Sequence, residues 1–192
     1  MEKEQIKSKL LSKKKDILET IKFLAISIAI VIPIRMFIAQ PFIVSGESMF
    51  PTFKNGQYLI IDELSYNLGQ PHRGDVVVFR YPNDPKRYFI KRIIGLPNEQ
   101  IIIEAGKVTI INSENPNGFE LKESYLKQEF LDTISFKTLD NEYFVLGDNR
   151  NRSSDSRVWG ALPEKLIIGK AFLRLLPISD FSYKPGDINN IK

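Results

Sequence analysis

The chain has 192 residues, no cysteine, one histidine and a formal net charge of +4. A chain of this length predicts one main domain with a core of its own, and a second full domain is not expected. The lack of cysteine excludes thiol nucleophiles, zinc-thiolate sites, disulfides and any metal cluster of histidine and cysteine.

The positive charge is concentrated at the N-terminus, where residues 1–22 hold seven lysines against four acidic residues. The rest of the chain has 20 basic and 19 acidic residues. A nucleic-acid-binding surface would be expected to show its own basic patch, so no nucleic-acid partner is expected for the folded part. Taken alone, the lysine-rich arm is more typical of a solvated tail.

An apolar segment follows the arm. Residues 23–34 carry no charge, and residues 36–44 extend the segment with only Arg35 between the two runs. Because about 20 mostly apolar residues cross a bilayer, residues 23–41 are predicted to form one transmembrane signal anchor. Basic residues stay on the cytoplasmic side, so residues 1–22 would be a cytoplasmic arm and the remainder would lie outside.

The alternatives to an uncleaved anchor are a cleaved secretory signal and a buried or interfacial helix. The apolar region of a secretory signal is typically about 7 to 15 residues long and ends in a small-residue cleavage site. No such site is evident around Ala39, which is followed by Gln40 and Pro41. The anchor is therefore favoured.

Residues 42–192 are predicted to form a mainly β domain. Short runs rich in β-branched or aromatic residues alternate with glycine and proline, as strands and turns require. This spacing indicates a sandwich or barrel-like β domain rather than βαβ units. Residues 104–107 have the pattern of a tight hairpin turn, and the polar stretch 112–141 is predicted to be an inserted flap or small subdomain. The predicted strands are residues 57–61, 75–81, 87–95, 100–104, 107–111, 142–146 and 166–176.

Ser48 is a candidate nucleophile. It lies in the run Ser45–Thr52, which contains a proline turn shortly after the apolar segment. A serine hydroxyl is a weak nucleophile and needs an adjacent base. The single histidine, His72, lies in a polar run, which makes a lysine the better candidate base. Considered in isolation, Ser48 is more typical of an ordinary turn serine.

Lys91 is the candidate base, because it interrupts the apolar strand-like run 88–95. A lysine accepts a proton only when neutral, and at a pKa of about 10.4 it is almost wholly charged near neutral pH. Burial in an apolar strand would lower the pKa toward the range of about 7 to 8 that catalytic lysines use. Considered alone, Lys91 is more typical of a snorkelling or edge-strand charge.

A dense polar loop, residues 147–157, follows the predicted strand 142–146. One interpretation is a solvated loop stabilised by Asn and Asp turns. The other is a supporting loop, in which a hydroxyl orients the lysine and an ion pair between Asp155 and Arg157 fixes the backbone.

Four segments, in this order, make the chain similar to the bacterial type I signal peptidases, which are membrane-anchored serine endopeptidases with a Ser-Lys dyad. Each motif alone is weak, and the four together are specific. The resemblance covers most of the chain from the apolar segment to Pro177, and region 112–141 is the least matched. The segments are Ser45–Thr52, Arg73–Phe79, Lys91–Pro97 and Gly147–Arg157.

The resemblance implies a signal-peptidase-like β-sheet catalytic domain in which Ser48 is the nucleophile and Lys91 the general base. Ser153 would hydrogen-bond the lysine, while Asp155 and Arg157 would be structural supports. No metal and no cofactor are implied.

The oxyanion hole is where the chain departs from part of the family. In the family the nucleophile's backbone N–H is joined, in some members, by a serine hydroxyl two positions earlier. Gly46 occupies that position here, so the second donor is unassigned, and loss of such a donor can cost roughly 10²- to 10³-fold in rate. Glu47 is a further local difference of unknown weight.

Substrate recognition also follows from the resemblance. Family members bind the segment before the cleavage site as an extended strand, with small residues at the first and third positions, and strand addition supplies main-chain hydrogen bonds. Each matching pocket position is equally typical of a core residue. These positions are Phe42, Val44, Met49, Phe53, Phe89 and Ile90.

The implied activity is hydrolysis of one peptide bond in signal-peptide-bearing preproteins. The implied place is the outer face of the bacterial cytoplasmic membrane, with a single pass through the lipid bilayer and a cytoplasmic N-terminus. The enzyme would work as a monomer beside the secretion machinery.

Three alternatives remain to be weighed. Ser124 and Lys127 match the S-x-x-K pattern of penicillin-binding proteins, but Leu139 follows Lys137-Thr138 where that family has glycine. Self-cleaving repressors share a related Ser-Lys β domain, yet carry a DNA-binding domain where this chain has its apolar segment. A membrane-tethered β binding module without catalysis would be favoured by loss of the serine or the lysine, and both are present.

Overall fold

The computed structural model describes residues 2–37, 39–127 and 130–188. The chain divides into two compact units, Met1–Ala39 and Gln40–Lys192. The first unit contains one helix, α1 (Glu2–Phe37), of 36 residues. Large apolar side chains on this helix are exposed, among them Phe23 and Ile26.

Within the residues that the structure describes, no helix combines the length and the apolar character needed to cross a membrane. Residue 38, inside the predicted anchor 23–41, lies outside the described residues.

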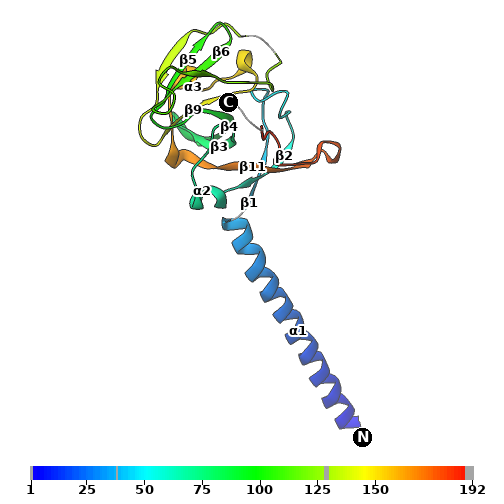
Figure 1. Cartoon of the computed structure of the whole chain (residues 1–192). Coiled ribbons are helices and arrows are strands. Elements are labelled where there is room, and N and C mark those ends of the chain that lie inside the picture. The colour runs from blue at the N-terminus through cyan, green and yellow to red at the C-terminus, as the bar shows by residue number, and fades with distance from the viewer. Residues whose placement is uncertain (1, 38, 128–129, 189–192) are drawn as a thin grey trace. The chain divides into compact units, whose positions relative to one another are not determined.

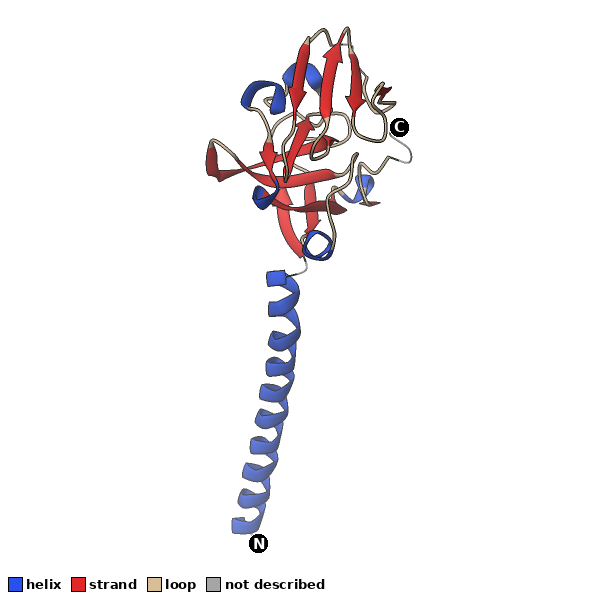
Figure 2. Ribbon diagram, turned by 60° about the vertical axis from the view of Figure 1, so that its left-hand side comes forward, coloured by secondary structure: helices blue, strands red, loops and turns tan. Residues whose placement is uncertain are grey.

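The second unit consists mainly of strands, which confirms the mainly β prediction (Figure 1, Figure 2). The larger sheet contains β1 (Ala39–Ile43), β2 (Tyr58–Asp62), β3 (Val76–Tyr81), β4 (Asp84–Gly95), β9 (Glu142–Leu146), β10 (Leu162–Pro163), β11 (Ile167–Leu176) and β12 (Ser182–Tyr183). Its eight strands have the order β1-β2-β11-β3-β4-β9-β10, and β12 pairs with β11.

The smaller sheet has four strands in the order β7-β6-β5-β8. They are β5 (Gln100–Glu104), β6 (Lys107–Ile111), β7 (Phe119–Glu120) and β8 (Ile134–Lys137). The short helices of the unit are α2 (Leu64–Leu68), α3 (Ser156–Trp159), η1 (Arg150–Arg152), η2 (Glu164–Leu166) and η3 (Ile178–Asp180).

The seven predicted strands correspond to β2, β3, β4, β5, β6, β9 and β11, and the bounds of β5, β6 and β9 agree to the residue. The turn between β5 and β6 has positive φ at both central residues, 47° at Ala105 and 79° at Gly106. Positive φ at both central residues is what a type I′ hairpin turn requires, and the backbone twist of that turn matches the twist of the strands it joins. The remaining strands, β1, β7, β8, β10 and β12, are not predicted from the sequence.

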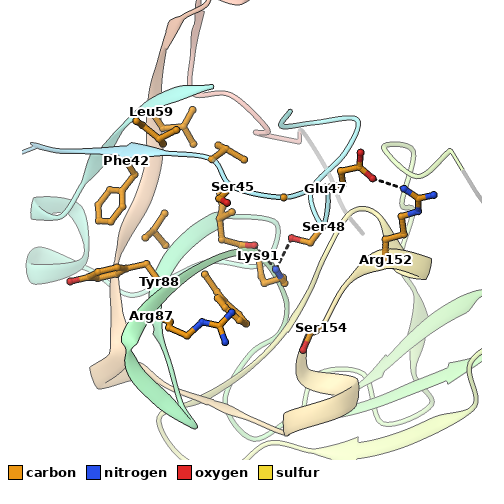
Figure 3. Close-up of a pocket in the computed structure, with 16 residues that line it drawn as sticks. Phe42, Ser45, Glu47, Ser48, Leu59, Arg87, Tyr88, Lys91, Arg152 and Ser154 are labelled. Carbon is orange, nitrogen blue, oxygen red and sulfur yellow. Dashed lines mark hydrogen bonds and ion pairs between the residues drawn. The ribbon is translucent and has the colours of Figure 1, made fainter. Parts of the chain in front are cut away.

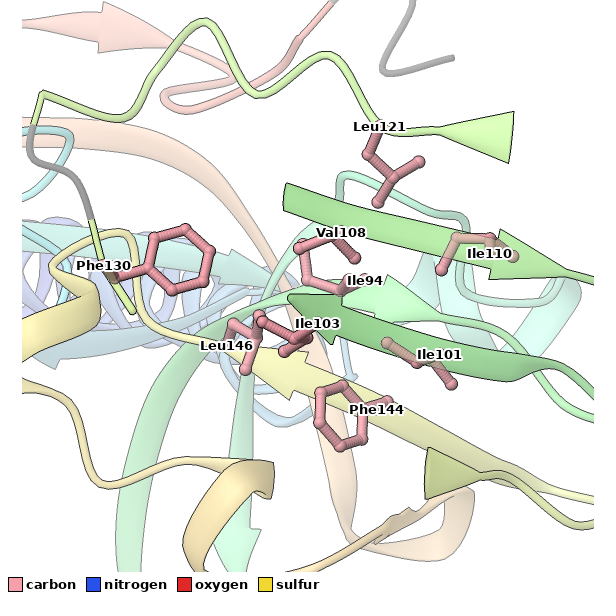
Figure 4. Close-up of a cluster of buried hydrophobic side chains, with 9 residues drawn as sticks. All are labelled: Ile94, Ile101, Ile103, Val108, Ile110, Leu121, Phe130, Phe144 and Leu146. Atoms are coloured by element: carbon pink, nitrogen blue, oxygen red, sulfur yellow. The ribbon is translucent and has the colours of Figure 1, made fainter. Parts of the chain in front are cut away.

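Region 112–141 contributes β7 and β8 to the smaller sheet, where they pair with β6 and β5. Leu121 and Phe130 from this region pack on a buried cluster that includes Ile101, Ile103 and Phe144 (Figure 4). Residues 128–129 lie outside the described residues. The role of the region as an inserted flap stays a prediction.

The strand β4 positions the candidate base. It pairs with β3 so that Lys91 lies opposite Val77 and Arg92 opposite Val76, and it then pairs with β9 from Arg92 onward. Successive side chains of a strand point to opposite faces. Lys91 and Arg92, both buried, therefore enter two different environments on the two sides of the sheet.

Candidate active site

Ser48 lies in the loop between β1 and β2. Backbone hydrogen bonds tighten this loop, with Phe50 N donating to Glu47 O at 3.1 Å and Phe53 N donating to Met49 O at 2.9 Å. The carbonyl oxygen of Ser48 itself accepts a hydrogen bond from Asn149 N at 2.9 Å. The backbone on both sides of the serine is thus held in place.

The Lys91 ammonium nitrogen lies 2.8 Å from the hydroxyl oxygen of Ser48 (Figure 3). It also donates to the carbonyl oxygen of Ile90 at 2.9 Å. The two residues that the sequence nominates separately are therefore within hydrogen-bond reach of one another, as a nucleophile and its base must be.

The surroundings of Lys91 favour its neutral form. The side chain is buried, and desolvation lowers the pKa of Lys91 to about 8, although the negative charges of Asp155 and Asp148 oppose the shift. The Phe89 ring lies 5.2 Å from the ammonium nitrogen. A lysine with this pKa is partly deprotonated at mildly alkaline pH and can take the serine proton.

The expected hydrogen bond between Ser153 and Lys91 is not formed. The Ser153 hydroxyl oxygen is buried and has no hydrogen-bond partner within the described ranges. The lysine nitrogen is directed to Ser48 and Ile90 instead. The Ser153 side chain packs against Gly147, where an added Cβ would lie 2.2 Å from its hydroxyl oxygen.

Asp155 and Arg157 form a two-point ion pair, with Nε and Nη2 of the arginine each 2.8 Å from a carboxylate oxygen. Asp155 also accepts a hydrogen bond from Gly147 N at 3.1 Å. Arg157 donates to the carbonyl oxygen of Arg150 at 2.6 Å. Both ends of the polar loop are thereby joined.

A second buried ion pair, between Arg92 and Asp148, has no counterpart in the sequence predictions. Arg92 also donates to the carbonyl oxygens of Gly74 and Gly186, at 2.7 Å and 2.6 Å. The sequence does contain one indication of this ion pair: Arg92 lies in an apolar strand, and a buried arginine needs a carboxylate partner. The partner's identity depends on the fold.

A cavity of about 500 Å³ opens beside Ser48 and Lys91 (Figure 3). Four of the six predicted pocket residues line it: Phe42, Val44, Phe89 and Ile90. Further walls that the sequence analysis does not name come from Leu59, Val78 and Tyr88.

The other two predicted pocket residues, Met49 and Phe53, lie in the core. Their side chains are 1% and 0% exposed, and they pack in the cluster that includes Leu59 and Val76. They are not among the residues that line this cavity, and their part in substrate recognition stays a prediction.

Charged residues lie at the rim of the cavity, where Glu47 forms an ion pair with Arg152 and both side chains are mostly exposed (Figure 3). Exposed pairs of this kind contribute little to stability. Gly46 lies two positions before Ser48, where some family members have a serine. It has a φ of 93°, and an added Cβ there would meet no atom within 4 Å. Its N–H donates to Asn55 at 2.9 Å.

Comparisons with known proteins point to one family. The family model described as signal peptidase, peptidase S26, matches residues 17–176. Signal peptidase I of Leptolyngbya laminosa is 36% identical over 171 residues, covering 85% of this chain and 81% of that protein. Signal peptidase I S of Bacillus subtilis strain 168 is 35% identical over 188 residues, covering 91% and 97%.

A solved structure of a signal peptidase I from Enterococcus faecalis V583 is 28% identical, with a TM-score of 0.46, and the match covers 53% of this chain and 97% of that chain. With its family model and its relatives in agreement, the chain belongs to the signal peptidase family, peptidase S26.

Proposed function

We propose that this chain, a signal peptidase by family, is a membrane-anchored serine endopeptidase that uses Ser48 and Lys91 as a catalytic dyad. It cleaves the signal peptides of exported preproteins. The observation that carries the proposal is the 2.8 Å contact between the Lys91 nitrogen and the Ser48 hydroxyl, inside a buried environment that lowers the pKa of the lysine.

In the acylation step, neutral Lys91 takes the hydroxyl proton of Ser48 while the serine oxygen attacks the carbonyl carbon of the scissile peptide bond. The backbone N–H of Ser48 is the donor proposed for the oxyanion that develops. The Lys91 ammonium then gives its proton to the departing amine, the C–N bond breaks, and an ester to Ser48 remains.

In the deacylation step, Lys91 is neutral again and takes a proton from a water molecule. The water oxygen attacks the ester carbon, the bond to the serine oxygen breaks, and the proton returns to Ser48. The product is the carboxyl end of the signal peptide, and both catalytic side chains regain their starting protonation states.

The cavity next to the dyad supports recognition of small side chains before the cleaved bond. Its apolar walls, from Phe42, Val44, Phe89 and Ile90, suit small apolar groups of the size of alanine. Addition of the substrate as an extended strand would supply the main-chain hydrogen bonds.

Membrane anchoring through residues 23–41 is part of the same proposal. It is supported by the uncharged run 23–34 and the lysine-rich residues 1–22, which would keep the N-terminus cytoplasmic. The catalytic unit would then be extracytoplasmic, at a bacterial cytoplasmic membrane, as a monomer beside the secretion machinery. Alkaline carbonate extraction of membranes carrying the full chain tests the anchor: it should remain in the pellet, and release of intact chain would refute it.

The dyad is tested with detergent-purified full chain and a preprotein substrate. Ser48→Ala and Lys91→Ala should each lower cleavage by roughly 10³-fold or more, since neither partner works alone. Lys91→Arg should fail as well, because a guanidinium is not deprotonated in proteins. Ser179→Ala and Lys86→Ala, at exposed positions outside the cavity, are the controls. Parental activity in either alanine variant of the dyad would refute the assignment.

A further inference from the structure

Glu123, in region 112–141, is buried against Arg150 of the polar loop. The two side chains are 6% and 1% exposed. Arg150 Nη1 donates to one carboxylate oxygen at 3.0 Å, and Nη2 donates to the other. Tyr125 donates its hydroxyl to the same carboxylate, and the Phe130 ring lies 4.8 Å from the Arg150 guanidinium. Region 112–141 therefore surrounds the Arg150 guanidinium with a carboxylate, the tyrosine hydroxyl bound to that carboxylate, and an aromatic ring.

Arg150 also forms hydrogen bonds to residues near both ends of loop 147–157. Its Nε donates to the carbonyl oxygen of Gly147 at 3.0 Å. Its own carbonyl oxygen accepts from Arg157, which is also paired with Asp155. Asp132, again from region 112–141, binds the same Arg157. Two carboxylates of that region thus hold two arginines of the polar loop.

The polar loop in turn contacts the backbone of the nucleophile. Asn149 N donates to the carbonyl oxygen of Ser48 at 2.9 Å. Gly147 approaches so closely that an added Cβ would lie 2.5 Å from that same oxygen. A continuous series of contacts therefore runs from the Glu123 carboxylate, through the Arg150 guanidinium and the Gly147 carbonyl, to the turn that carries Ser48.

From these contacts we propose that Glu123 is a positioning residue: it fixes Arg150 and thereby holds loop 147–157 in the register that places Ser48 for attack. The inference rests on the proposed dyad of Ser48 and Lys91. A buried ion pair often stabilises a fold no better than apolar packing of the same volume. The Glu123–Arg150 pair is instead important for the position of Ser48, because small displacements of a reacting group strongly reduce the rate.

The test compares Glu123→Gln with the parent, using detergent-purified full chain at a temperature at which circular dichroism shows both to be folded. The glutamine keeps the shape and removes the charge. We expect kcat to fall roughly 10- to 100-fold. KM should stay within about threefold, because the apolar walls of the cavity lie in or next to β1, β2, β3 and β4. Glu120→Gln is the matched control, since Glu120 lies in the same region in an exposed pair with Lys107 and should keep the parental kcat.

If Glu123→Gln does not fold, Glu123→Asp takes its place, because it keeps the charge and withdraws the carboxylate by one methylene. A drop in kcat of several-fold is then expected. A folded variant with parental kcat, or the same loss in Glu120→Gln, would overturn the positioning role. Failure of the dyad is separable: it shows as activity in Ser48→Ala, whereas parental kcat in the Glu123 variant beside an inactive Ser48→Ala refutes only the positioning role.

Discussion

The Arg92 guanidinium and the Asp148 carboxylate form a two-point ion pair with neither side chain exposed to solvent. Nε lies 2.8 Å from one carboxylate oxygen and Nη2 lies 2.7 Å from the other. Arg92 follows Lys91 on β4, and Asp148 follows Gly147, which abuts the backbone of Ser48. The pair therefore joins the strand of the proposed base to the loop beside the proposed nucleophile.

Asp148→Asn should destabilise the fold by about 3 to 5 kcal/mol, because it leaves the Arg92 charge buried and unpaired. Urea unfolding of the full chain, followed by circular dichroism, measures the change. Glu120→Gln, which breaks the exposed pair with Lys107, should cost no more than about 1 kcal/mol. A loss of that small size in Asp148→Asn would show that the buried pair is not needed for stability.

Cleavage should increase with pH as Lys91 loses its proton. With the pKa of Lys91 lowered to about 8 by burial, the acid limb of the kcat/KM profile is expected to have its midpoint near that value. Well below it, the rate should fall about tenfold per pH unit, since only the neutral amine is active. A profile that is flat from pH 6 to about 9 would contradict a lysine base.

Lys91→Met should stabilise the fold at neutral pH. The pKa of Lys91 is about 8 in the folded chain, against about 10.4 in an unfolded one. Between these values the unfolded state keeps a proton that the folded state has lost, so stability increases with pH across this window. Below this pH window Lys91 is charged in the folded state, and its burial costs about 3 kcal/mol of folding free energy, which methionine would not cost.

The stabilisation by Lys91→Met should therefore be full at pH 7 and fade as the pH approaches about 10.4. Urea unfolding at several pH values measures it. Lys86→Met, at an exposed position of the same strand, should change stability little at any pH. An unfolding free energy unaffected by Lys91→Met at pH 7 would mean that burial does not penalise the lysine charge.

Gly147→Ala should impair catalysis through the backbone of Ser48. An added Cβ would lie 2.5 Å from the Ser48 carbonyl oxygen and 2.2 Å from the Ser153 hydroxyl oxygen, so the packing of loop 147–157 against the turn of Ser48 must change. A displacement of this order can reduce kcat roughly 10²-fold. In the control Gly69→Ala, the nearest contact of the Cβ is an ordinary 3.4 Å, and kcat should be unchanged. Equal kcat for the two variants would refute the close packing at Gly147.

Local sequence signals account for much of the fold. The strands β5, β6 and β9 are predicted to the residue, since each is a run of alternating or continuous apolar residues bounded by turn residues. β7, β10 and β12 have only two residues each, which is too short for any periodicity to show. β8 alternates apolar and polar residues over only four positions, which is a weak signal, and it pairs with β5 while Ile134 and Phe136 pack on the buried cluster.

The proposed site was likewise predicted only in part from the sequence. Ser48, Lys91, Asp155 and Arg157 are nominated from the sequence, because their residue types and the order of their motifs have recognisable chemical meaning. The cavity is only partly predicted, since Met49 faces the core while Val44, also apolar, lines the cavity. Whether an apolar side chain lines the cavity depends on how its neighbours pack, and the residue type does not reveal it.

By itself the sequence determined the mainly β class, the principal strands, the absence of thiol chemistry and the resemblance to signal peptidases, which the family comparison confirms. Only the tertiary structure decided the contacts themselves: it brings Ser48 to Lys91 across 43 residues, and it pairs Arg92 with Asp148 across 56, a partnership that the sequence does not predict. The physical reason is that strand and turn preferences act between near neighbours. A buried charge instead takes whichever partner the packing of distant strands and loops brings within hydrogen-bond distance.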